Sequence, residues 1–490
     1  MKLLLVNTPI NRLDILGNFA PIYNDMKMVP TGLAYLASFA REAGVDVRIL
    51  DQYAECLRMD QIFNRIAEFS PDLIGYSATT PNYYAAIDLV RSVKHKFPAI
   101  PTVLGGYHPS VLAEPTLAEP AVDFVIRDEG EDALVRLCDA LDRGRKDFSG
   151  IAGLSYKESR GQVHNPKSAN VDVNALPFPA YDLLPMSLYS SPSYTNFAAP
   201  VYQMIASRGC PYHCTFCINA ELNVSAAYRQ RDVKSVVDEM EMLRTKYQAR
   251  QIQFWDPQFP LGKGHAEAFC REVISRGLHK KLVWNSTTRA EFLDDATLDL
   301  MVASGCRGLG FGVESGDPGL LRSVQKKLDL EKLRKVSRIA QKKGFVVSAF
   351  FIFGFPGETK ETAQTTIDYA KSLDIHYAQF SIMTPYPGTP LYRELKDHGE
   401  ISPAEKDDFV RYNQSVGLTE LDPIYVPHGW TAVELKAVQK RAYTQFYLRP
   451  KMVWRHLRHL RPSKILGMTK SLRAILSLLL REKAASGTTT

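Results

Sequence analysis

The chain has 490 residues and a mass of 55.0 kDa, which is enough for two or three domains of about 100–200 residues each. Its composition, 45% hydrophobic and 23% charged, is that of a soluble globular protein and excludes global disorder and collagen-like or low-complexity classes. The formal net charge of +7 is unevenly distributed. Residues 449–483 hold ten basic residues and one acid, a net of +9, so the rest of the chain carries −2.

No run of about 18 apolar residues occurs, which excludes a transmembrane helix. The apolar stretch Leu3–Val6 is too short for a secretion signal and is typical of a first strand. Seven cysteines in a chain with no export signal indicate a reducing cytoplasm, where clustered thiols bind metal in preference to forming disulfides. We therefore expect a cytoplasmic protein.

Residues 1–145 alternate apolar runs typical of strands with amphipathic stretches typical of helices. The apolar runs are Leu3–Val6, Val47–Leu50, Leu73–Ser77, Thr102–Leu104 and Phe124–Ile126. This alternation predicts an α/β fold with a parallel sheet, and five strands favour a flavodoxin-like doubly wound domain. Ligands bind beyond the carboxyl ends of the strands in such sheets. Polar and glycine-rich segments fall at those ends.

The strand–helix pattern is interrupted over 146–200, where a linker is expected, and it resumes over 201–395. Six further apolar runs there predict a partial (β/α)6 barrel of the TIM type, whose working face is the carboxyl ends of its strands. These runs are Tyr202–Ala206, Ile252–Trp255, Leu282–Thr287, Arg307–Gly312, Phe345–Phe353 and Tyr377–Met383. An accessory region is expected over 396–448, and a basic, amphipathic helical tail over 449–490.

Three cysteines, Cys210, Cys214 and Cys217, lie within eight residues just after the first predicted barrel strand. A loop with this spacing can wrap three thiolates around one 4Fe-4S cluster and leave one iron open for substrate chemistry. The alternative is a zinc site, which usually takes four protein ligands. His213 could supply the fourth, but its position between two of the cysteines makes that geometry awkward.

Together with its surrounding motifs, this cysteine loop resembles the radical S-adenosylmethionine (SAM) superfamily, and the resemblance spans about residues 201–395. In that family SAM binds the open iron and is cleaved to a 5′-deoxyadenosyl radical. The runs Gly310–Gly316, Phe353–Thr359 and Pro385–Pro390 match further family motifs. The resemblance implies four SAM-facing residues, with Asp256 holding the amino group and Phe216 near the adenine: Phe216, Asp256, Arg289 and Glu314.

These assignments have structural alternatives. Arg289 and Glu314 could instead form an ion pair within the barrel. The segment Gly354–Glu358 could be a turn closed by a helix cap, because a carboxylate is favourable at the amino terminus of a helix. Carboxylates at strand ends nevertheless suit a ligand that carries an ammonium group, as SAM does.

The order of the two domains resembles the cobalamin-binding class of this superfamily, in which the corrin lies over the strand ends of the first domain and faces the cluster. This resemblance implies that the polar loops of the first domain contact the corrin or its nucleotide tail. The residues concerned are Ser77, Ala78, Thr79, Gly105, Gly106, His108, Glu129 and Gly130. The two adjacent glycines suit this role because a flat macrocycle needs close approach to the backbone.

One departure from other cobalamin proteins concerns the cobalt ligand. The D-x-H-x-x-G motif, whose histidine ligates cobalt in many of them, is absent, and the first strand is followed by Asn7–Arg12. If cobalamin binds, we expect no histidine below the cobalt. His108 is either a direct contact or a capping histidine, and the domain could also be a relic that binds no cobalamin.

The number of cysteines excludes two related classes. Methylthiotransferases carry a second three-cysteine cluster in the amino-terminal domain, where only Cys56 and Cys138 occur here. Enzymes with auxiliary clusters carry a cysteine-rich carboxyl extension, whereas only Cys270 and Cys306 follow the loop in this chain. We therefore expect a single cluster.

The resemblance implies a C-methyltransferase, in which the radical abstracts hydrogen from an unactivated carbon and methylcobalamin supplies the methyl group. The main alternative is an oxidative cyclase or dehydrogenase of the anaerobic Mg-protoporphyrin monomethyl ester cyclase type. A non-catalytic cobalamin- or membrane-binding regulator is a third hypothesis, against which the intact cluster motif argues. An electron donor of the flavodoxin or ferredoxin type is implied, and no general base can be assigned.

The basic tail combines apolar stripes with Arg and Lys residues. Such a helix either lies in an anionic membrane surface or packs on the barrel with a solvated basic face. The first hypothesis predicts an enzyme held at the inner membrane surface that acts on a small lipidic or tetrapyrrole-like substrate. Nucleic acid is not expected, because no RNA-binding module is recognised and the rest of the chain is slightly acidic.

Overall fold

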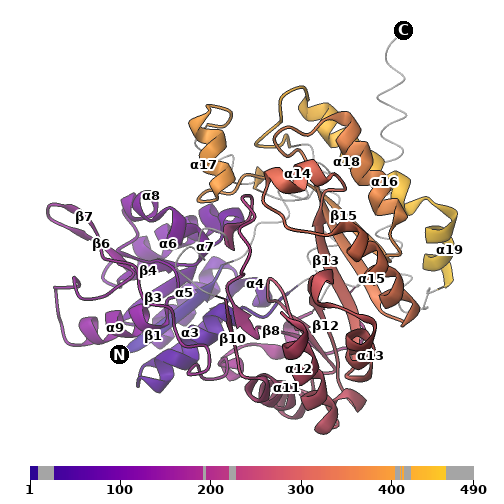
Figure 1. Cartoon of the computed structure of the whole chain (residues 1–490). Helices are drawn as coiled ribbons and strands as arrows, with labels where there is room; N and C mark the ends of the chain where they lie inside the picture. Colours follow the sequence, from indigo (N-terminus) through magenta and orange to yellow (C-terminus); the bar gives the residue numbers. More distant parts are fainter. Residues whose placement is uncertain are drawn as a thin grey trace.

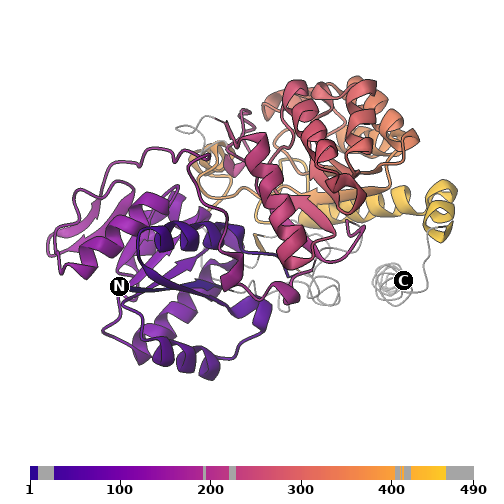
Figure 2. The same cartoon turned by 90° about the horizontal axis from the view of Figure 1, so that it is seen from below.

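The computed structural model describes residues 1–8, 27–190, 195–219, 228–402, 409, 411–412 and 421–458. Two α/β units lie side by side, the first in indigo to purple and the second in magenta to orange (Figures 1 and 2). Each is built on its own sheet, which confirms the predicted α/β organisation.

The first sheet has seven strands in the order β2-β1-β3-β4-β5-β6-β7, and β1 to β5 are parallel. These five are β1 (Lys2–Asn7), β2 (Asp46–Asp51), β3 (Leu73–Ser77), β4 (Thr102–Gly105) and β5 (Phe124–Ile126). Their order is the flavodoxin-like one, as predicted. Successive side chains of a strand point to opposite faces of the sheet, so the apolar run of β1 places buried side chains on both faces. Both faces therefore need helices to cover them.

Both faces of this sheet are covered by helices. Leu3 and Leu5 of β1 pack with α3 (Thr31–Glu42) and α9 (Glu131–Asp142) on one face. Leu4 and Val6 pack with helices of the other face. Those helices are α5 (Met59–Phe69) and α6 (Tyr83–Lys96).

The prediction of a linker over 146–200 is wrong for the part that contains residues 154–164, which form two strands. β6 (Leu154–Glu158) and β7 (Gly161–His164) form an antiparallel hairpin that extends the first sheet from β5. Only the short run Leu154–Tyr156 is buried, so the sequence offers little apolar signal for these strands. Tyr181, further along the segment, is buried in the core of the barrel, so the chain crosses between the units there.

The second sheet has six parallel strands in the order β15-β14-β13-β12-β11-β8, which confirms the six predicted barrel strands. They are β8 (Val201–Met204), β11 (Gln251–Phe254), β12 (Val283–Thr287), β13 (Cys306–Glu314), β14 (Val346–Phe353) and β15 (Tyr377–Ile382). No pairing between β15 and β8 occurs among the described strands, so the barrel is open.

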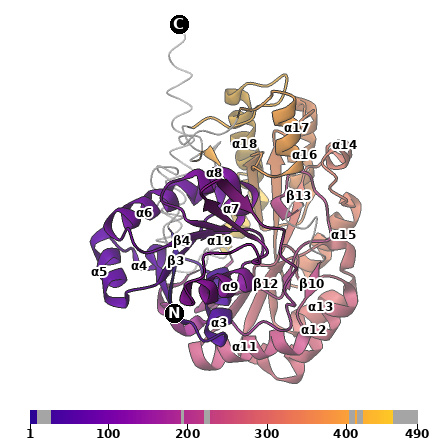
Figure 3. The same ribbon diagram turned by 90° about the vertical axis from the view of Figure 1, so that its left-hand side faces the viewer.

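Helices cover the outer face of this sheet. α12, α13 and α15 lie on the side of the second unit that is remote from the first unit (Figure 3). The covering helices include α11 (Val233–Tyr247), α12 (Lys263–Ser275), α13 (Asp295–Ala303), α15 (Leu330–Lys342) and α16 (Lys360–Ser372). Val347, Ala349, Phe351 and Phe353 of β14 are buried in the core they form with the sheet, whereas the residues between them are only half-buried. The alternation therefore assigns one face of β14 to the helices.

Two short strands lie outside the main sheets. β9 (Ser207–Arg208) and β10 (Arg229–Gln230) pair antiparallel, and the chain between them carries the three cysteines. Residues 220–227 of that connection lie outside the described residues.

The accessory region packs against the barrel. α18 (Ala432–Tyr447) lies against the edge strand β15, where Gln439 Nε2 donates to Phe380 O at 2.7 Å. α14 (Pro318–Ser323) and α17 (Pro390–Asp397) lie nearer the first unit (Figure 1).

The described start of the tail is the helix α19 (Pro450–Arg458), and residues 459–490 lie outside the described residues. Met452 is fully buried, Arg449 donates to Lys371 O, and Arg455 donates to Ile375 O at 2.6 Å. This first part therefore packs on the barrel. No helix among the described residues is long and apolar enough to cross a membrane.

Candidate functional site

Backbone hydrogen bonds fix the part of the cysteine loop that runs from Cys214 to Cys217. Cys210, Cys214 and Cys217 are all free thiols, and the Cys217 N–H donates to Cys214 O at 3.0 Å. The Thr215 N–H donates to Val324 O at 3.1 Å, which ties the loop to the segment after α14. The loop thus lies beside the carboxyl end of β13, at the face where a barrel of this kind has its working site.

The three thiols interact electrostatically with one another. Burial raises the pKa of the Cys214 thiol to about 11, Lys326 lowers it, and the Cys217 and Cys210 thiols raise it. His213, which the zinc alternative needs as its fourth ligand, is exposed to solvent. Among the described residues, no three His, Cys, Asp or Glu side chains converge to hold a single metal ion. Three cysteines within eight residues of one loop are the ligand set that a 4Fe-4S cluster takes, with one thiolate on each of three irons.

Asp256 follows β11 and is buried beneath the start of the cysteine loop. Its carboxylate accepts hydrogen bonds from the Ala206 N–H at 3.0 and 3.1 Å and from the Ser207 hydroxyl. Burial raises its pKa to about 6, and the hydrogen bonds from Ser207 and Ala206 act in the opposite direction. Asp256 therefore holds the strand from which the loop departs.

Arg289 and Glu314 do not pair with each other, so the ion-pair alternative is wrong. Arg289 pairs with Glu291 at 2.7 Å, and its guanidinium lies 3.9 Å from the ring centroid of Tyr212. Glu314 pairs with Lys326 at 2.9 Å and has a left-handed backbone with a φ of 69°. Each side chain has a partner that strand-end positions alone do not reveal.

Two buried polar atoms beside Cys210 have no hydrogen-bond partner in the described structure, Arg289 Nη1 and Gln258 Oε1. Burial raises the pKa of the Cys210 thiol while Arg289 lowers it, and Gln258 Nε2 approaches Cys210 Sγ at 3.9 Å. Leaving buried polar atoms unpaired costs free energy, so each such atom needs an explanation. The carboxylate and ammonium groups of SAM complement this donor and acceptor. No sequence motif marks Gln258.

Phe216 forms part of an apolar wall beside the cysteines. Its ring centroid lies 5.3 Å from that of Phe355, and both rings belong to a cluster with Leu320 and Val324. An aromatic wall in this place is suited to stacking against a planar heterocycle.

Glu358 is a buried carboxyl group that closes a turn. It accepts a hydrogen bond from the Gly354 N–H, and burial raises its pKa to about 8. Thr359, not Glu358, caps α16, because its side chain accepts from the Thr362 N–H. The helix-cap alternative for Glu358 is therefore wrong, although the predicted turn is present.

A cavity of about 490 Å³ opens at the carboxyl ends of β1, β3, β4 and β5, where the two units meet. Six of the eight residues predicted for cobalamin line it: Ser77, Thr79, Gly105, Gly106, Glu129 and Gly130. Barrel residues Arg208, Gly209 and Trp255 line its other side. The cavity therefore reaches from the first sheet to the base of the cysteine loop.

The other two predicted residues, Ala78 and His108, do not line the cavity, which corrects that expectation. Ala78 is fully buried within the first unit. His108 is 1% exposed, its Nδ1 lies 3.2 Å from Thr80 Oγ1, and its ring packs at 4.0 Å from that of Tyr83. Burial lowers its pKa to about 3. It is a neutral core histidine.

The adjacent residues Gly105 and Gly106 differ in whether the fold requires glycine at that position. Gly106 has a φ of 97° and a ψ of −174°, and a Cβ there would lie 2.6 Å from Ala78 O, so the fold itself requires glycine. A Cβ on Gly105 would meet only Ile126 O, at 3.6 Å. Packing therefore does not require glycine at Gly105, which lines the cavity.

Two family models match the chain, the B12 binding domain over residues 24–138 and the Radical SAM superfamily over residues 204–370. An uncharacterized methyltransferase of Pyrococcus horikoshii is 35% identical over 458 residues, covering 92% of this chain and 94% of that protein. The chain belongs to the cobalamin-binding radical SAM enzymes.

Another member of this family, the anaerobic magnesium-protoporphyrin IX monomethyl ester cyclase of Rubrivivax gelatinosus, is 30% identical over 405 residues. The match covers 81% of this chain and 70% of the cyclase. Among solved structures, the radical SAM methyltransferase TsrM from Kitasatospora setae, with tryptophan and a SAM analog bound, has a TM-score of 0.70 at 21% identity. That match covers 92% of this chain and 90% of TsrM, and it supports the two-domain fold.

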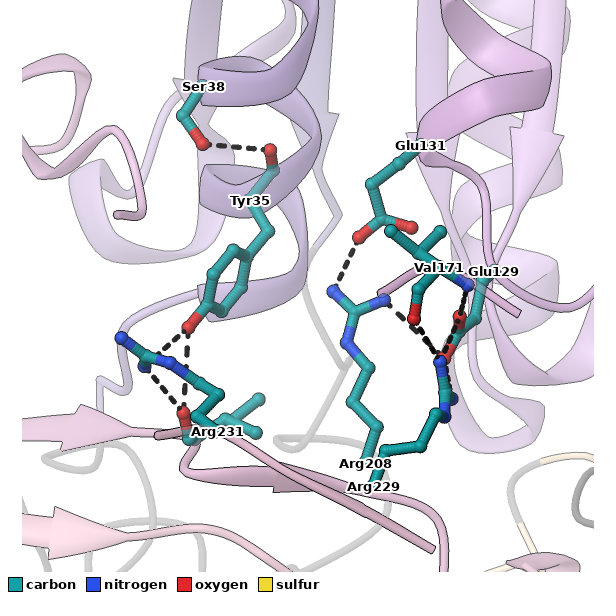
Figure 4. Close-up of polar contacts among 9 residues, drawn as sticks. Tyr35, Ser38, Glu129, Glu131, Val171, Arg208, Arg229 and Arg231 are labelled. Atoms are coloured by element: carbon teal, nitrogen blue, oxygen red, sulfur yellow. Dashed lines mark hydrogen bonds and ion pairs between the residues drawn. The ribbon is translucent and has the colours of Figure 1, made fainter. Parts of the chain in front are cut away.

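Viewed as a cobalamin-binding radical SAM enzyme, the chain has contacts between its domains that the sequence does not reveal. Arg208 and Arg229 flank the cysteine loop and bind Glu129 and Glu131 of the first domain (Figure 4). The Glu129 carboxylate, predicted to contact cobalamin, is thus engaged by arginine. The exposed indole of Trp255 lines the cavity beside Asp256.

Proposed function

We propose that this enzyme is a cobalamin-dependent radical SAM methyltransferase that methylates an unactivated carbon of a small molecule. The observation that carries the proposal is the shared cavity, whose wall combines the strand ends of the B12-binding domain with Arg208 and Gly209 at the base of the cysteine loop. One substrate in this space can reach both cofactors. When bound, a 4Fe-4S cluster with SAM supplies a 5′-deoxyadenosyl radical, and cobalamin supplies the methyl group.

Three cysteines hold the cluster in this proposal, Cys210, Cys214 and Cys217, and leave one iron for SAM. The unpaired Arg289 Nη1 takes the carboxylate of SAM, and the unpaired Gln258 Oε1 takes its ammonium group. The electron for the cluster comes from an external donor of the flavodoxin or ferredoxin type.

Asp256, expected from the sequence to hold the SAM amino group, is instead engaged by Ala206 and Ser207, so in this proposal it and the remaining predicted SAM residues have less direct roles. Phe216 provides the wall for the adenine. Asp256 positions the loop through Ala206 and Ser207, and Glu314 holds Lys326 beside the thiols.

Cobalamin lies in this proposal on the strand ends that carry Ser77, Thr79, Gly105 and Gly130. Gly105 lets the ligand approach the backbone closely. The burial of His108 in the core agrees with a cobalt that has no histidine below it.

Anaerobic turnover with SAM that carries a deuterated methyl group, followed by mass spectrometry, tests the methyl transfer. A methyltransferase adds the label to its product and forms S-adenosylhomocysteine together with 5′-deoxyadenosine. The alternative is an oxidative cyclase, favoured by the 30% identity to the Rubrivivax cyclase, and it forms 5′-deoxyadenosine with no label in the product.

We also propose that the tail holds the enzyme at an anionic membrane surface, where a lipidic or tetrapyrrole-like substrate would be available. Trp454 and Val453 on α19 are 67% and 42% exposed, and Lys451 beside them is also exposed. An exposed tryptophan next to basic residues suits a membrane interface. Truncation at Arg449 removes α19 together with the residues after it, and it should abolish binding to anionic liposomes while leaving the cluster intact. Unchanged binding would contradict this proposal.

A further inference from the structure

Two arginines face each other at the base of the cysteine loop. Arg208 of β9 and Arg229 of β10 are directly opposite in the antiparallel register. Like charges in this arrangement destabilise a two-stranded ladder. Both side chains are also largely buried, at 19% and 18% exposed, which adds a desolvation cost. The hairpin that carries the cluster loop therefore needs negative charge from elsewhere.

That charge comes from the other domain. Glu129 accepts two hydrogen bonds from Arg229, Nη1 to Oε2 at 3.0 Å and Nη2 to Oε1 at 2.5 Å. Arg208 donates from Nη2 to Glu131 Oε1 at 2.5 Å, and its Nη1 lies 3.5 Å from Glu129 Oε1. Figure 4 shows the two glutamates reaching from the first domain to the two arginines. We call these four residues the interdomain clamp.

Tyr35 of α3 supports the clamp from the same domain. Arg208 lies 5.5 Å from the centroid of its ring, and its hydroxyl oxygen accepts a hydrogen bond from Arg231 Nη1 at 2.9 Å. Arg231 follows β10 directly and pairs with the fully buried Glu239. The first domain thus contacts both strands of the hairpin and the residue after it.

The clamp is also part of the cavity wall. Glu129, Glu131, Arg208 and Arg229 all line the cavity, and Gly130 lies between the two glutamates. A ligand that fills the cavity therefore packs against the residues that hold both ends of the cluster loop. Contacts made by several charge-assisted hydrogen bonds are geometrically specific, so ordering one side of the clamp orders the other.

We propose that Glu129 and Glu131 are positioning residues that couple the two cofactor sites, so that cobalamin and the iron–sulfur cluster bind cooperatively. This inference rests on the proposed function, because it needs both cofactors at the sites described above. Cobalamin orders the Glu129–Glu131 segment, the clamp then holds the hairpin, and the hairpin presents the cysteines. Linkage requires the cluster to raise the affinity for cobalamin by the same factor.

Equilibrium dialysis of hydroxocobalamin against the full-length protein tests this coupling, with and without a reconstituted cluster. We expect the cluster to tighten cobalamin binding to the wild type within the range of about 5- to 150-fold that is typical of coupled sites. In Glu129→Gln/Glu131→Gln each cofactor should still bind alone, but the ratio of the two Kd values should fall to about one. The electron paramagnetic resonance spectrum of the reduced cluster should shift on adding cobalamin only in the wild type.

Arg41→Gln is the matched control. It removes an interaction of α3 with Asp182 at 2.8 Å, in which both side chains are 44% exposed, and it should leave the ratio of Kd values unchanged. If the double variant does not fold by circular dichroism, Arg229→Lys replaces it, because lysine keeps the charge and loses the two-point contact with Glu129.

Two outcomes separate this inference from the proposed function. A wild type that binds both cofactors with a Kd ratio near one, or a folded clamp variant that keeps the wild-type ratio, would overturn the inference alone. A wild type that binds neither cofactor would overturn the proposed function and the inference together.

Discussion

The buried ion pair behind the cysteine loop offers a sharp test of the structure. Glu239 of α11 is fully buried and accepts hydrogen bonds from Arg231 Nη1 at 2.5 Å and from the Tyr181 hydroxyl at 2.6 Å. Arg231 is itself only 5% exposed. Glu239→Gln keeps the size and shape of the side chain and removes its charge. The variant therefore leaves the Arg231 cation in the core without its counter-charge.

Breaking one side of a buried ion pair costs about 3–5 kcal/mol, since the remaining charge stays desolvated. Arg231 keeps hydrogen bonds to Ile205 O at 2.9 Å and to Ser235 Oγ at 3.1 Å, which lessens the loss. We therefore expect Glu239→Gln to lower the free energy of unfolding by about 3 kcal/mol, the lower end of that range.

Urea unfolding followed by circular dichroism measures this loss. Arg41→Gln, which removes the exposed pair with Asp182, should change the free energy of unfolding by less than about 1 kcal/mol. A loss below about 1 kcal/mol for Glu239→Gln, equal to that of the exposed control, would refute the reasoning that the Arg231 site is desolvated.

Other substitutions test the cofactor sites and a buried acid. Cys214→Ala should lose the visible absorbance of the cluster and most of its iron while remaining folded, and full iron content would contradict the cluster assignment. Gly106→Ala should destabilise the protein by about 1–3 kcal/mol because of its φ of 97°, whereas Gly105→Ala should fold normally and weaken cobalamin binding. Burial raises the Glu358 pKa from 4.5 to about 8, so the wild type should lose stability as pH rises through this window, by at most about 1.4 kcal/mol per pH unit. In Glu358→Gln the urea midpoint should depend less on pH between about pH 6 and 8 than it does in the wild type. The same pH dependence in both proteins would contradict the raised pKa.

Both sheets follow from the sequence because each parallel strand is a short apolar run set between amphipathic helices. The run Leu73–Ser77 corresponds to β3, and Phe345–Phe353 corresponds to β14 with a one-residue difference at its start. The cysteine loop is equally readable, since its three ligands lie within eight residues. β6 and β7 escape prediction because they form a short hairpin with few buried apolar residues.

Contacts between distant segments could not be predicted. Arg229 meets Glu129 across 100 residues of chain, and Arg208 meets Glu131 across 77, because the two domains pack together there. His108 lies just after the end of β4, as the sequence predicts, but only its packing against Tyr83 shows that its ring points into the core. Residue type and strand position therefore indicate which segments border a site, whereas side-chain direction depends on tertiary packing.

The fate of SAM in the reconstituted enzyme tests the central claim most directly. Protein with its cluster is incubated anaerobically with SAM and a reductant, with and without added cobalamin and candidate substrates, and the nucleoside products are quantified by mass spectrometry. The methyltransferase account predicts S-adenosylhomocysteine that depends on cobalamin, formed together with 5′-deoxyadenosine. Formation of 5′-deoxyadenosine with no S-adenosylhomocysteine, whether or not cobalamin is present, would contradict it.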